Sequence, residues 1–182
     1  KLNFNDKYPF IYQYTARQFI DQALTTRSDS LSNFNRKITG KYKAGLGLRY
    51  LADYIGDSII SASFQEFYLK NNLKYAKSDD FKKIVSSKTT KDISWFFEDY
   101  LKTTKKIDYT IKKAIIKDDS VYVTIKNKRN MTAPVALYGL KNKQVKFKKW
   151  LTNIDSTKTI AIPKNGFNRV SLNFENSYPE FN

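Results

Sequence analysis

The spacing of apolar residues in the first part of the chain predicts helices. From Ala44 to Ile55, apolar side chains recur every three or four positions, as they do on one face of a helix. Gly56 can end this helix in a left-handed conformation, and Asp57 can cap the next one. Similar patterns predict helices over residues 57–69, from Ser78, from Asp92 and over 15–24, with a polar loop at 28–35. The first 104 residues are therefore expected to be helical.

The pattern changes near Lys105, after which apolar and polar residues alternate as in β-strands. Ile107, Tyr109 and Ile111 form the first alternating set. Further strands are predicted at residues 121–125, 135–138, 145–150, 158–162 and 168–174, with turn sequences between them. Regularly spaced short strands are typical of an antiparallel β-sandwich. We therefore expect an α+β fold of two domains, a helical bundle at 1–104 followed by an Ig-like β-sandwich at 105–182.

The composition excludes several kinds of active site. The 182 residues include no His and no Cys. The chain alone therefore cannot hold an imidazole base, a Ser-His-Asp triad, a thiolate nucleophile, an HExxH zinc site or a disulfide. Its apolar runs, such as Val135–Tyr138, are far shorter than the roughly 18 residues that span a bilayer, so no membrane span is predicted.

The positive charge suggests an anionic partner but does not specify one. Lys and Arg number 33 against 17 Asp and Glu, which gives +16, and residues 105–182 alone carry 16 basic and 6 acidic residues, or +10. Only six of the basic residues are Arg, the side chain that makes bidentate base contacts. Lysines spread along the chain favour a solvated surface, so nucleic acid is not the expected partner. Binding to nucleic acid or an anionic surface remains the third functional hypothesis.

Four short motifs could carry chemistry, but each has a simpler structural interpretation. Asp118–Asp119 could contribute to a cation site, although a hairpin turn explains the pair better. Glu98–Asp99 are adjacent on a predicted helix and therefore point apart. Gly45–Gly47 lacks the preceding strand of a phosphate loop. Phe147–Trp150 could stack on bases, but its alternation favours core aromatics beside exposed lysines.

Four stretches of the helical part resemble a known protein family. They are residues 42–57 (YKAGLGLRYLADYIGD), the predicted helix with Phe64 and Tyr68, and residues 78–81 (SDDF) and 91–101 (KDISWFFEDYL). In order and spacing they are similar to the region downstream of the zinc site in the aminopeptidase N family of gluzincin metallopeptidases. In that family a β-sandwich domain follows, and the strand-rich half here, with Ala133–Gly139 and Trp150, resembles it. The resemblance covers about residues 8–182.

The resemblance implies that the parent protein is a zinc exopeptidase that removes N-terminal residues from peptides. In the family, an HExxH helix and a downstream Glu hold zinc, and an upstream Gly-rich acidic motif holds the substrate amine. This chain, without His, would start after the metal site. It would form part of the catalytic domain and the following sandwich, and would be inactive alone. Zinc and the peptide substrate would then be bound by the missing N-terminal half.

One catalytic residue of the family is expected within this chain. It is the Tyr of a Y-x-K-x-A motif, whose hydroxyl stabilises the oxyanion of the tetrahedral intermediate. Tyr42 is the candidate, but the family spacing of fifteen residues before Gly56 falls on Lys41. Either Tyr42 takes the role with a slip of one residue, or this protein has lost the group. The second alternative makes the parent a catalytically dead aminopeptidase-like module that binds peptides or acts as a scaffold.

Overall fold

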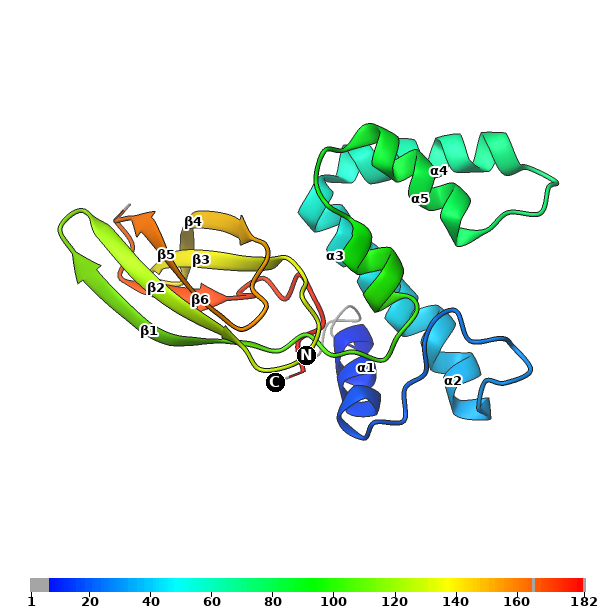
Figure 1. Ribbon diagram of the computed structural model, residues 1–182, viewed down its shortest axis with the longest axis horizontal. Coiled ribbons are helices and arrows are strands. Elements are labelled where there is room, and N and C mark those ends of the chain that lie inside the picture. Colours follow the sequence, from blue (N-terminus) through cyan, green and yellow to red (C-terminus); the bar gives the residue numbers. More distant parts are fainter. Residues whose placement is uncertain (1–6, 165, 182) are drawn as a thin grey trace. The chain divides into compact units, whose positions relative to one another are not determined.

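The computed structural model describes residues 7–164 and 166–181, which fall into two compact units (Figure 1). The helical unit comprises residues up to Ile11 together with Asp21–Thr104. The strand unit comprises Tyr12–Ile20 together with Lys105–Asn182. The identities expected for 1–104 and 105–182, a piece of a peptidase catalytic domain and an Ig-like domain, stay predictions.

The helical segments are short, and three of them begin where the sequence predicts. The α-helices are α1 (Lys7–Arg17), α2 (Asn33–Ile38), α3 (Ala44–Ile55), α4 (Asp57–Asn71) and α5 (Ser78–Lys88), and the π-helical turns are η2 (Thr39–Lys43) and η3 (Trp95–Tyr100). The predictions for α3, α4 and α5 are confirmed. Gly56 separates α3 from α4 at a φ of 116°, a backbone conformation that side chains other than glycine's rarely adopt.

Elsewhere the predicted helices differ from the structure. A helix over 15–24 was wrong, because α1 ends at Arg17 and Phe19 takes a φ of 55°. The loop predicted at 28–35 ends earlier than expected, since α2 begins at Asn33. The last helix of the unit is the π-helical η3, whose wider turn places four aromatic side chains in the core. Hydrophobic spacing alone does not distinguish this wider turn from an α-helix.

The core of the helical unit lies where α3 meets η3. Tyr50 and Leu51 of α3 have no exposed surface, and Phe96 and Phe97 of η3 are each 2% exposed. The ring centroids of Tyr50 and Trp95 lie 4.4 Å apart. Residues 42–57 and 91–101, two of the stretches that resemble the aminopeptidase family, therefore pack against each other.

The close approach of α3 to η3 gives a testable prediction for two glycines. A Cβ at Gly47 would lie 2.2 Å from Cε1 of the buried Tyr100 ring, whereas a Cβ at the exposed Gly45 meets nothing within 4 Å. We expect Gly47→Ala to lower the free energy of unfolding by about 2 kcal/mol through overpacking. Gly45→Ala should raise it by about 0.5 to 1 kcal/mol through helix propensity. Urea denaturation measures both, and equal effects would contradict the packing described here.

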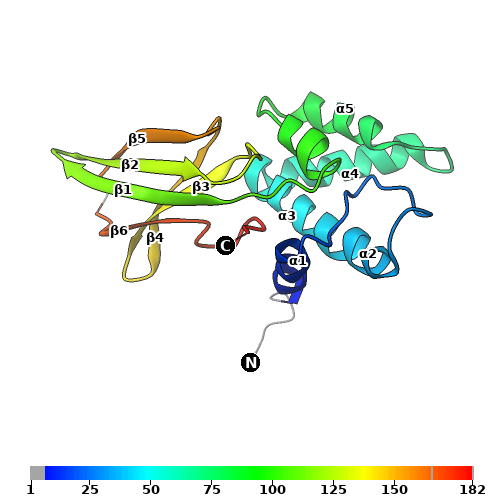
Figure 2. The same cartoon turned by 60° about the horizontal axis from the view of Figure 1, so that its bottom comes forward.

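The strand unit contains two three-stranded antiparallel sheets, ordered β1-β2-β5 and β4-β3-β6. The strands are β1 (Tyr109–Lys117), β2 (Ser120–Asn127), β3 (Val135–Lys141), β4 (Gln144–Leu151), β5 (Thr157–Pro163) and β6 (Arg169–Leu172). All six predicted strands are present. Figure 2 shows β1 and β2 as neighbouring strands of a long hairpin. In β2 the alternation is strict, with Val121, Val123 and Ile125 buried.

The fold class predicted from the sequence, a helical bundle followed by a β-sandwich, was wrong. The helices have only 6 to 15 residues and are interrupted by π-helical turns, so they do not form a bundle, although α4 and α5 lie side by side as a hairpin. A sandwich needs a buried inner face on every strand. After the bulge between Ile111 and Lys113, β1 is exposed at every residue, and β4 is exposed over most of its length. Strand spacing predicted the strands but not how the sheets are formed.

The C-terminal residues tie the ends of the strand unit together. Glu180 forms a parallel bridge with Ile107, and the Phe181 N–H donates to the Ile107 carbonyl at 2.8 Å. From α1, the Gln13 side chain donates to the Glu180 carbonyl at 3.2 Å, and Arg17 donates to the Phe181 carbonyl at 3.0 Å. This explains why residues 12–20 belong to the strand unit rather than to the helical one.

Candidate functional site

The structure places Tyr42 in η2, directly before α3. Its side chain is buried, at 8% exposure. The neighbouring Lys41 is exposed, and its Nζ lies 5.8 Å from the centroid of the Tyr42 ring. Tyr42, Leu46 and Tyr50 are all buried and are spaced four residues apart, as expected for one side of a helix. The candidate oxyanion residue therefore lies against the core of the helical unit.

Lys43, the next residue, is a buried cation that sequence analysis did not single out. It is 2% exposed, and its ammonium donates to the carbonyls of Gln22 at 3.2 Å and Thr103 at 3.0 Å. Nζ also lies 3.7 Å from the buried carboxylate of Asp21. One side chain thus joins three separate parts of the helical unit. Because a buried ammonium needs such partners, Lys43 fixes the start of α3 relative to the segments on either side.

A second interaction holds the same segment from the η3 side. The buried Tyr100 hydroxyl donates to the Lys43 carbonyl at 2.8 Å. The Lys43 ammonium also lies 5.8 Å from the centroid of the Tyr100 ring. The side chain and the carbonyl of Lys43 are therefore both held by other parts of the unit, which fixes the backbone next to Tyr42. Lys43 matches the Lys of the Y-x-K-x-A motif when Lys41 takes the Tyr position, but this match says nothing about burial.

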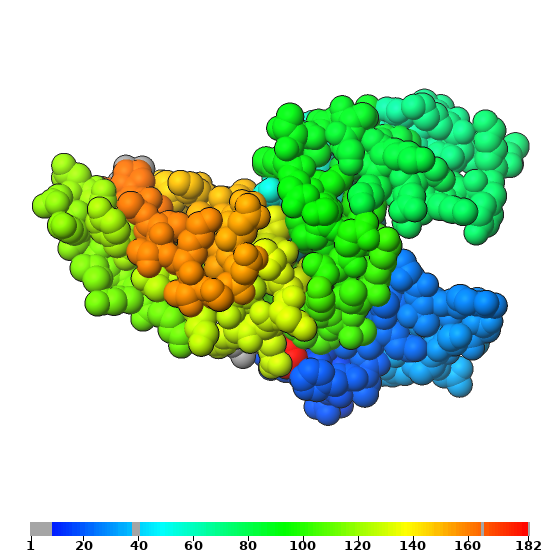
Figure 3. Space-filling view, viewed as in Figure 1, coloured from blue at the N-terminus to red at the C-terminus, as the bar shows by residue number. Residues whose placement is uncertain are grey.

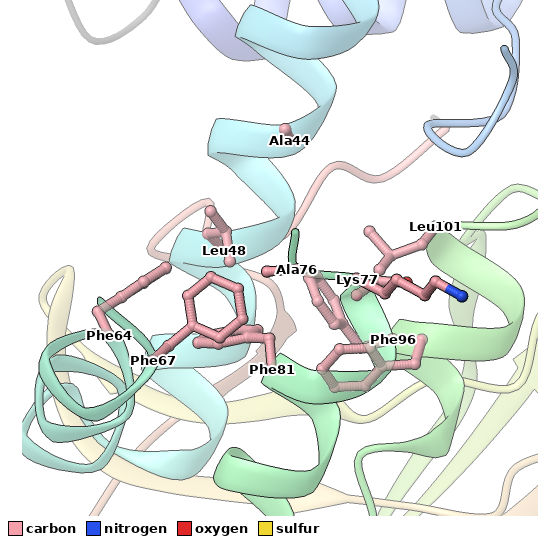
Figure 4. Close-up of a pocket in the computed structure, with 11 residues that line it drawn as sticks. Ala44, Leu48, Phe64, Phe67, Ala76, Lys77, Phe81, Phe96 and Leu101 are labelled. Atoms are coloured by element: carbon pink, nitrogen blue, oxygen red, sulfur yellow. The ribbon is translucent and has the colours of Figure 1, made fainter. Parts of the chain in front are cut away.

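An apolar pocket of about 330 Å³ opens beside this segment (Figure 4). Its lining comes from α3, α4, the loop before α5, the start of α5, η3 and the residue after η3: Ala44, Leu48, Phe64, Phe67, Ala76, Lys77, Ser78, Phe81, Phe96, Phe97 and Leu101. Phe81 is central, because its ring stacks on Phe64 at 4.8 Å and meets Phe67 edge-on at 5.4 Å. Tyr42 does not line the pocket. The structure therefore does not bring the candidate catalytic residue to this cavity.

Two carboxylates link the helices that surround the pocket. Glu66 of α4 accepts from Lys70 and Lys88 at 2.6 Å each, which joins α4 to α5. Glu98 of η3 accepts from Lys82 and Lys102 at the same distance, which joins η3 to α5. Hydrogen bonds from these lysines lower the pKa of both carboxyls to about 2. Glu98 is thus paired with two lysines, and its lowered pKa keeps it ionised near neutral pH.

The remaining motifs have structural roles. Asp118–Asp119 forms the two-residue turn between β1 and β2, with Asp118 at a φ of 53°, as the hairpin interpretation predicted. Phe147–Trp150 lies in β4, where Phe147 and Trp150 are half-buried and the two lysines between them are exposed. No group of three or more carboxylate, His or Cys side chains within residues 7–164 and 166–181 could hold a metal ion. Across the same residues, every helix is too short or too polar to cross a bilayer.

Comparison with known proteins finds similar structures but no similar sequence. No family of known proteins and no curated protein matches the sequence. Sixteen chains of solved structures match the fold. Among them is Legionella pneumophila aminopeptidase A in complex with aspartic acid, with a TM-score of 0.61 and 18% identity over 78% of this chain. This chain covers only 17% of the length of that protein. The fold of the chain is therefore similar to a portion of a solved aminopeptidase, and the likeness concerns the fold alone.

Proposed function

We propose that this chain is part of a zinc-dependent aminopeptidase of the gluzincin type, lying downstream of the metal site. In this role the helical unit braces the half that carries the metal and forms one wall of the peptide cleft. The observation that carries the proposal is the agreement of two independent signals. The sequence stretches that resemble the family form α3 and η3, and the fold resembles part of an aminopeptidase.

The side chains of this chain do not fit a zinc site. With no His and no Cys, and no suitable carboxylate cluster in its described residues, it offers no ligand set for the metal. The proposal therefore assigns the zinc and the groups that bind the substrate amine to the rest of the parent protein. The chain alone is expected to be inactive and to take up no zinc stoichiometrically. Zinc titration by calorimetry tests this, and one tight site per chain would contradict it.

The first experiment is hydrolysis of a panel of aminoacyl amides by the full-length parent, with and without a zinc chelator. Turnover that the chelator abolishes is the expected result. A folded, zinc-loaded parent that hydrolyses none of the amides would overturn the enzymatic proposal. It would instead favour the alternative, a catalytically dead peptide-binding or scaffolding module.

The surroundings of Tyr42 are the observation that favours this alternative. Lys41 occupies the position that the family spacing gives to the catalytic Tyr, and Tyr42 is buried among core side chains. A dead module predicts that the parent binds peptides without turnover. It also predicts that replacing Tyr42 leaves peptide affinity unchanged. Equilibrium binding of fluorescent peptides to the zinc-loaded parent distinguishes the two functions.

If the parent is active, Tyr42→Phe tests the oxyanion role directly. Removing one donor to an oxyanion lowers kcat by roughly 100-fold or more. We therefore expect kcat of the full-length Tyr42→Phe variant to fall by about that factor, with little change in KM. Tyr122→Phe removes a hydroxyl from an exposed position of β2 and serves as the matched control. Unchanged turnover in Tyr42→Phe would contradict the assignment.

A further inference from the structure

We propose that the connection between α4 and α5 is a docking site for an anionic lipid membrane surface. The site, called here the α4–α5 tip, consists of residues Tyr68–Lys77. It comprises the last turn of α4 and the loop that leads into α5. Figure 1 shows this connection at the end of the α4–α5 hairpin away from α3. In Figure 3 the same end is separated by an open recess from the blue α2 segment of the helical unit.

The tip exposes several large apolar side chains. Leu73 is 100% exposed, Tyr75 88%, Leu69 77% and Tyr68 66%. Single exposed apolar residues are ordinary on a protein surface, whereas large contiguous apolar patches are typical of interaction sites. Here four large exposed apolar side chains lie within eight consecutive residues. Leu73 is also held at a φ of 61°, an unfavourable conformation for a residue other than glycine. Leu73 therefore adopts a strained backbone conformation although its side chain contacts only solvent.

The charges of the tip identify its partner. Lys70, Lys74 and Lys77 alternate with the apolar residues, and residues 68–77 contain no Asp or Glu. Lys70 pairs with Glu66, and Asp79 and Asp80 lie in the first turn of α5, where Asp80 accepts from the Lys77 N–H. Lys74 and Lys77 are both exposed. Lysines around exposed leucines are complementary to a surface with anionic groups at its exterior and an apolar interior.

Lipid fits this pattern better than protein or nucleic acid does. Protein interfaces are depleted in Lys at their centres, and sequence-specific nucleic-acid sites use Arg and aromatic stacking more than aliphatic side chains. At a membrane surface, by contrast, Leu enters the acyl boundary and Tyr lies at the level of the headgroups. Lysine stems extend along apolar surface and bring their ammonium groups to the lipid phosphates. All three residue types are present in the tip.

Vesicle sedimentation tests the proposal. The chain is mixed with vesicles of phosphatidylcholine alone or with 30% phosphatidylglycerol, at low and moderate salt. Its net charge of +16 attracts any variant to the anionic vesicles, so the comparison must keep the charge constant. We expect Leu69→Ser/Leu73→Ser to lower the partition coefficient by about 10-fold or more. The control Ile116→Ser/Val145→Ser, at exposed positions of β1 and β4, should stay within about 2-fold of the unchanged chain.

Equal losses in both double variants, or no binding of the unchanged chain to anionic vesicles, would overturn the proposal. A second measurement uses the absence of Cys from the chain. The emission of an environment-sensitive fluorophore attached to the Leu73→Cys variant should shift to the blue with anionic vesicles, whereas that of the same label on Ile116→Cys should not. A blue shift of the position-73 label that depends on protein concentration without vesicles would show self-association through the tip and would likewise overturn the proposal. Circular dichroism checks that each variant is folded.

Discussion

Replacing Lys43 with Met is expected to lower the free energy of unfolding of the helical unit by about 3 to 5 kcal/mol. Met fills much of the volume of the Lys stem but donates no hydrogen bond. The carbonyls of Gln22 and Thr103 then lose a charged donor, and the buried Asp21 carboxylate loses its nearby ammonium. Taking the nearby counter-charge away from a buried carboxylate is more costly than the loss of one ordinary hydrogen bond.

Two further variants separate this effect from simple loss of packing. Lys41→Met changes the same residue type two positions earlier at an exposed site, and it should shift stability by less than about 0.5 kcal/mol. Lys43→Met/Asp21→Asn also removes the buried carboxylate of Asp21 and should recover part of the loss. Urea denaturation followed by circular dichroism gives the three values. A Lys43→Met variant as stable as the unchanged chain would show that the buried ammonium does not stabilise this segment.

The stability of the strand unit is expected to decrease as the pH rises from about 4.5 to 7, through Glu180. Burial is the main cause that raises the pKa of this carboxyl, and nearby Asp108 adds to the effect. Hydrogen bonds from the Tyr109 N–H and the Asn173 side chain, and the charge of Lys128, oppose the rise. The resulting pKa is about 7, against 4.5 for an ordinary glutamate.

The direction of the effect follows from proton binding. Below pH 4.5 Glu180 is protonated in both states, and its contribution to stability is fully present. Between 4.5 and 7 only the unfolded chain releases the proton, so the folded state becomes relatively less stable. The contribution is lost once the pH passes through the folded pKa. A difference of 7 minus 4.5 corresponds to a loss of roughly 3 kcal/mol at most.

The variant Glu180→Gln isolates this titration from that of the other groups. Gln keeps the shape of the protonated carboxyl and cannot ionise. We expect its free energy of unfolding to match that of the unchanged chain near pH 4.5 and to exceed it by up to roughly 3 kcal/mol above pH 7. Denaturant titrations at intervals of half a pH unit provide the comparison. Two parallel pH profiles would contradict the role given to Glu180.

The sequence predicted individual elements better than their assembly. Periodicity located α3, α4 and α5 and all six strands, because apolar residues recur along them at the spacing of a helix or a strand. It did not predict that β1 becomes exposed after its bulge, or that η3 has a π-helical turn. Both features depend on which other elements a strand or helix packs against once the chain has folded. The fold class was wrong for that reason, although most of the elements were right.

The candidate site likewise could be predicted in its position along the chain but not in its packing. The position of Tyr42 at the start of α3 follows from the sequence pattern, whereas its burial depends on packing within the unit. The sequence did not distinguish Lys43 from the other lysines, because the composition does not indicate which single charge is buried. Only the separate segments that contribute Asp21, Gln22 and Thr103 reveal its role. Those segments lie up to 60 residues from Lys43 in the chain.

The contacts between α1 and the C-terminal residues have a consequence for how the strand unit folds. Gln13 and Arg17 contact residues that lie 167 and 164 positions further along the chain. Loops of this length slow folding, because their closure entropy must be overcome before the contacts contribute. During synthesis on the ribosome, the helical unit can fold first, whereas the strand unit must wait until its last strand and the residues after it have emerged. A shortened chain that begins at Lys105 would lack one side of these contacts and should refold to a less stable product.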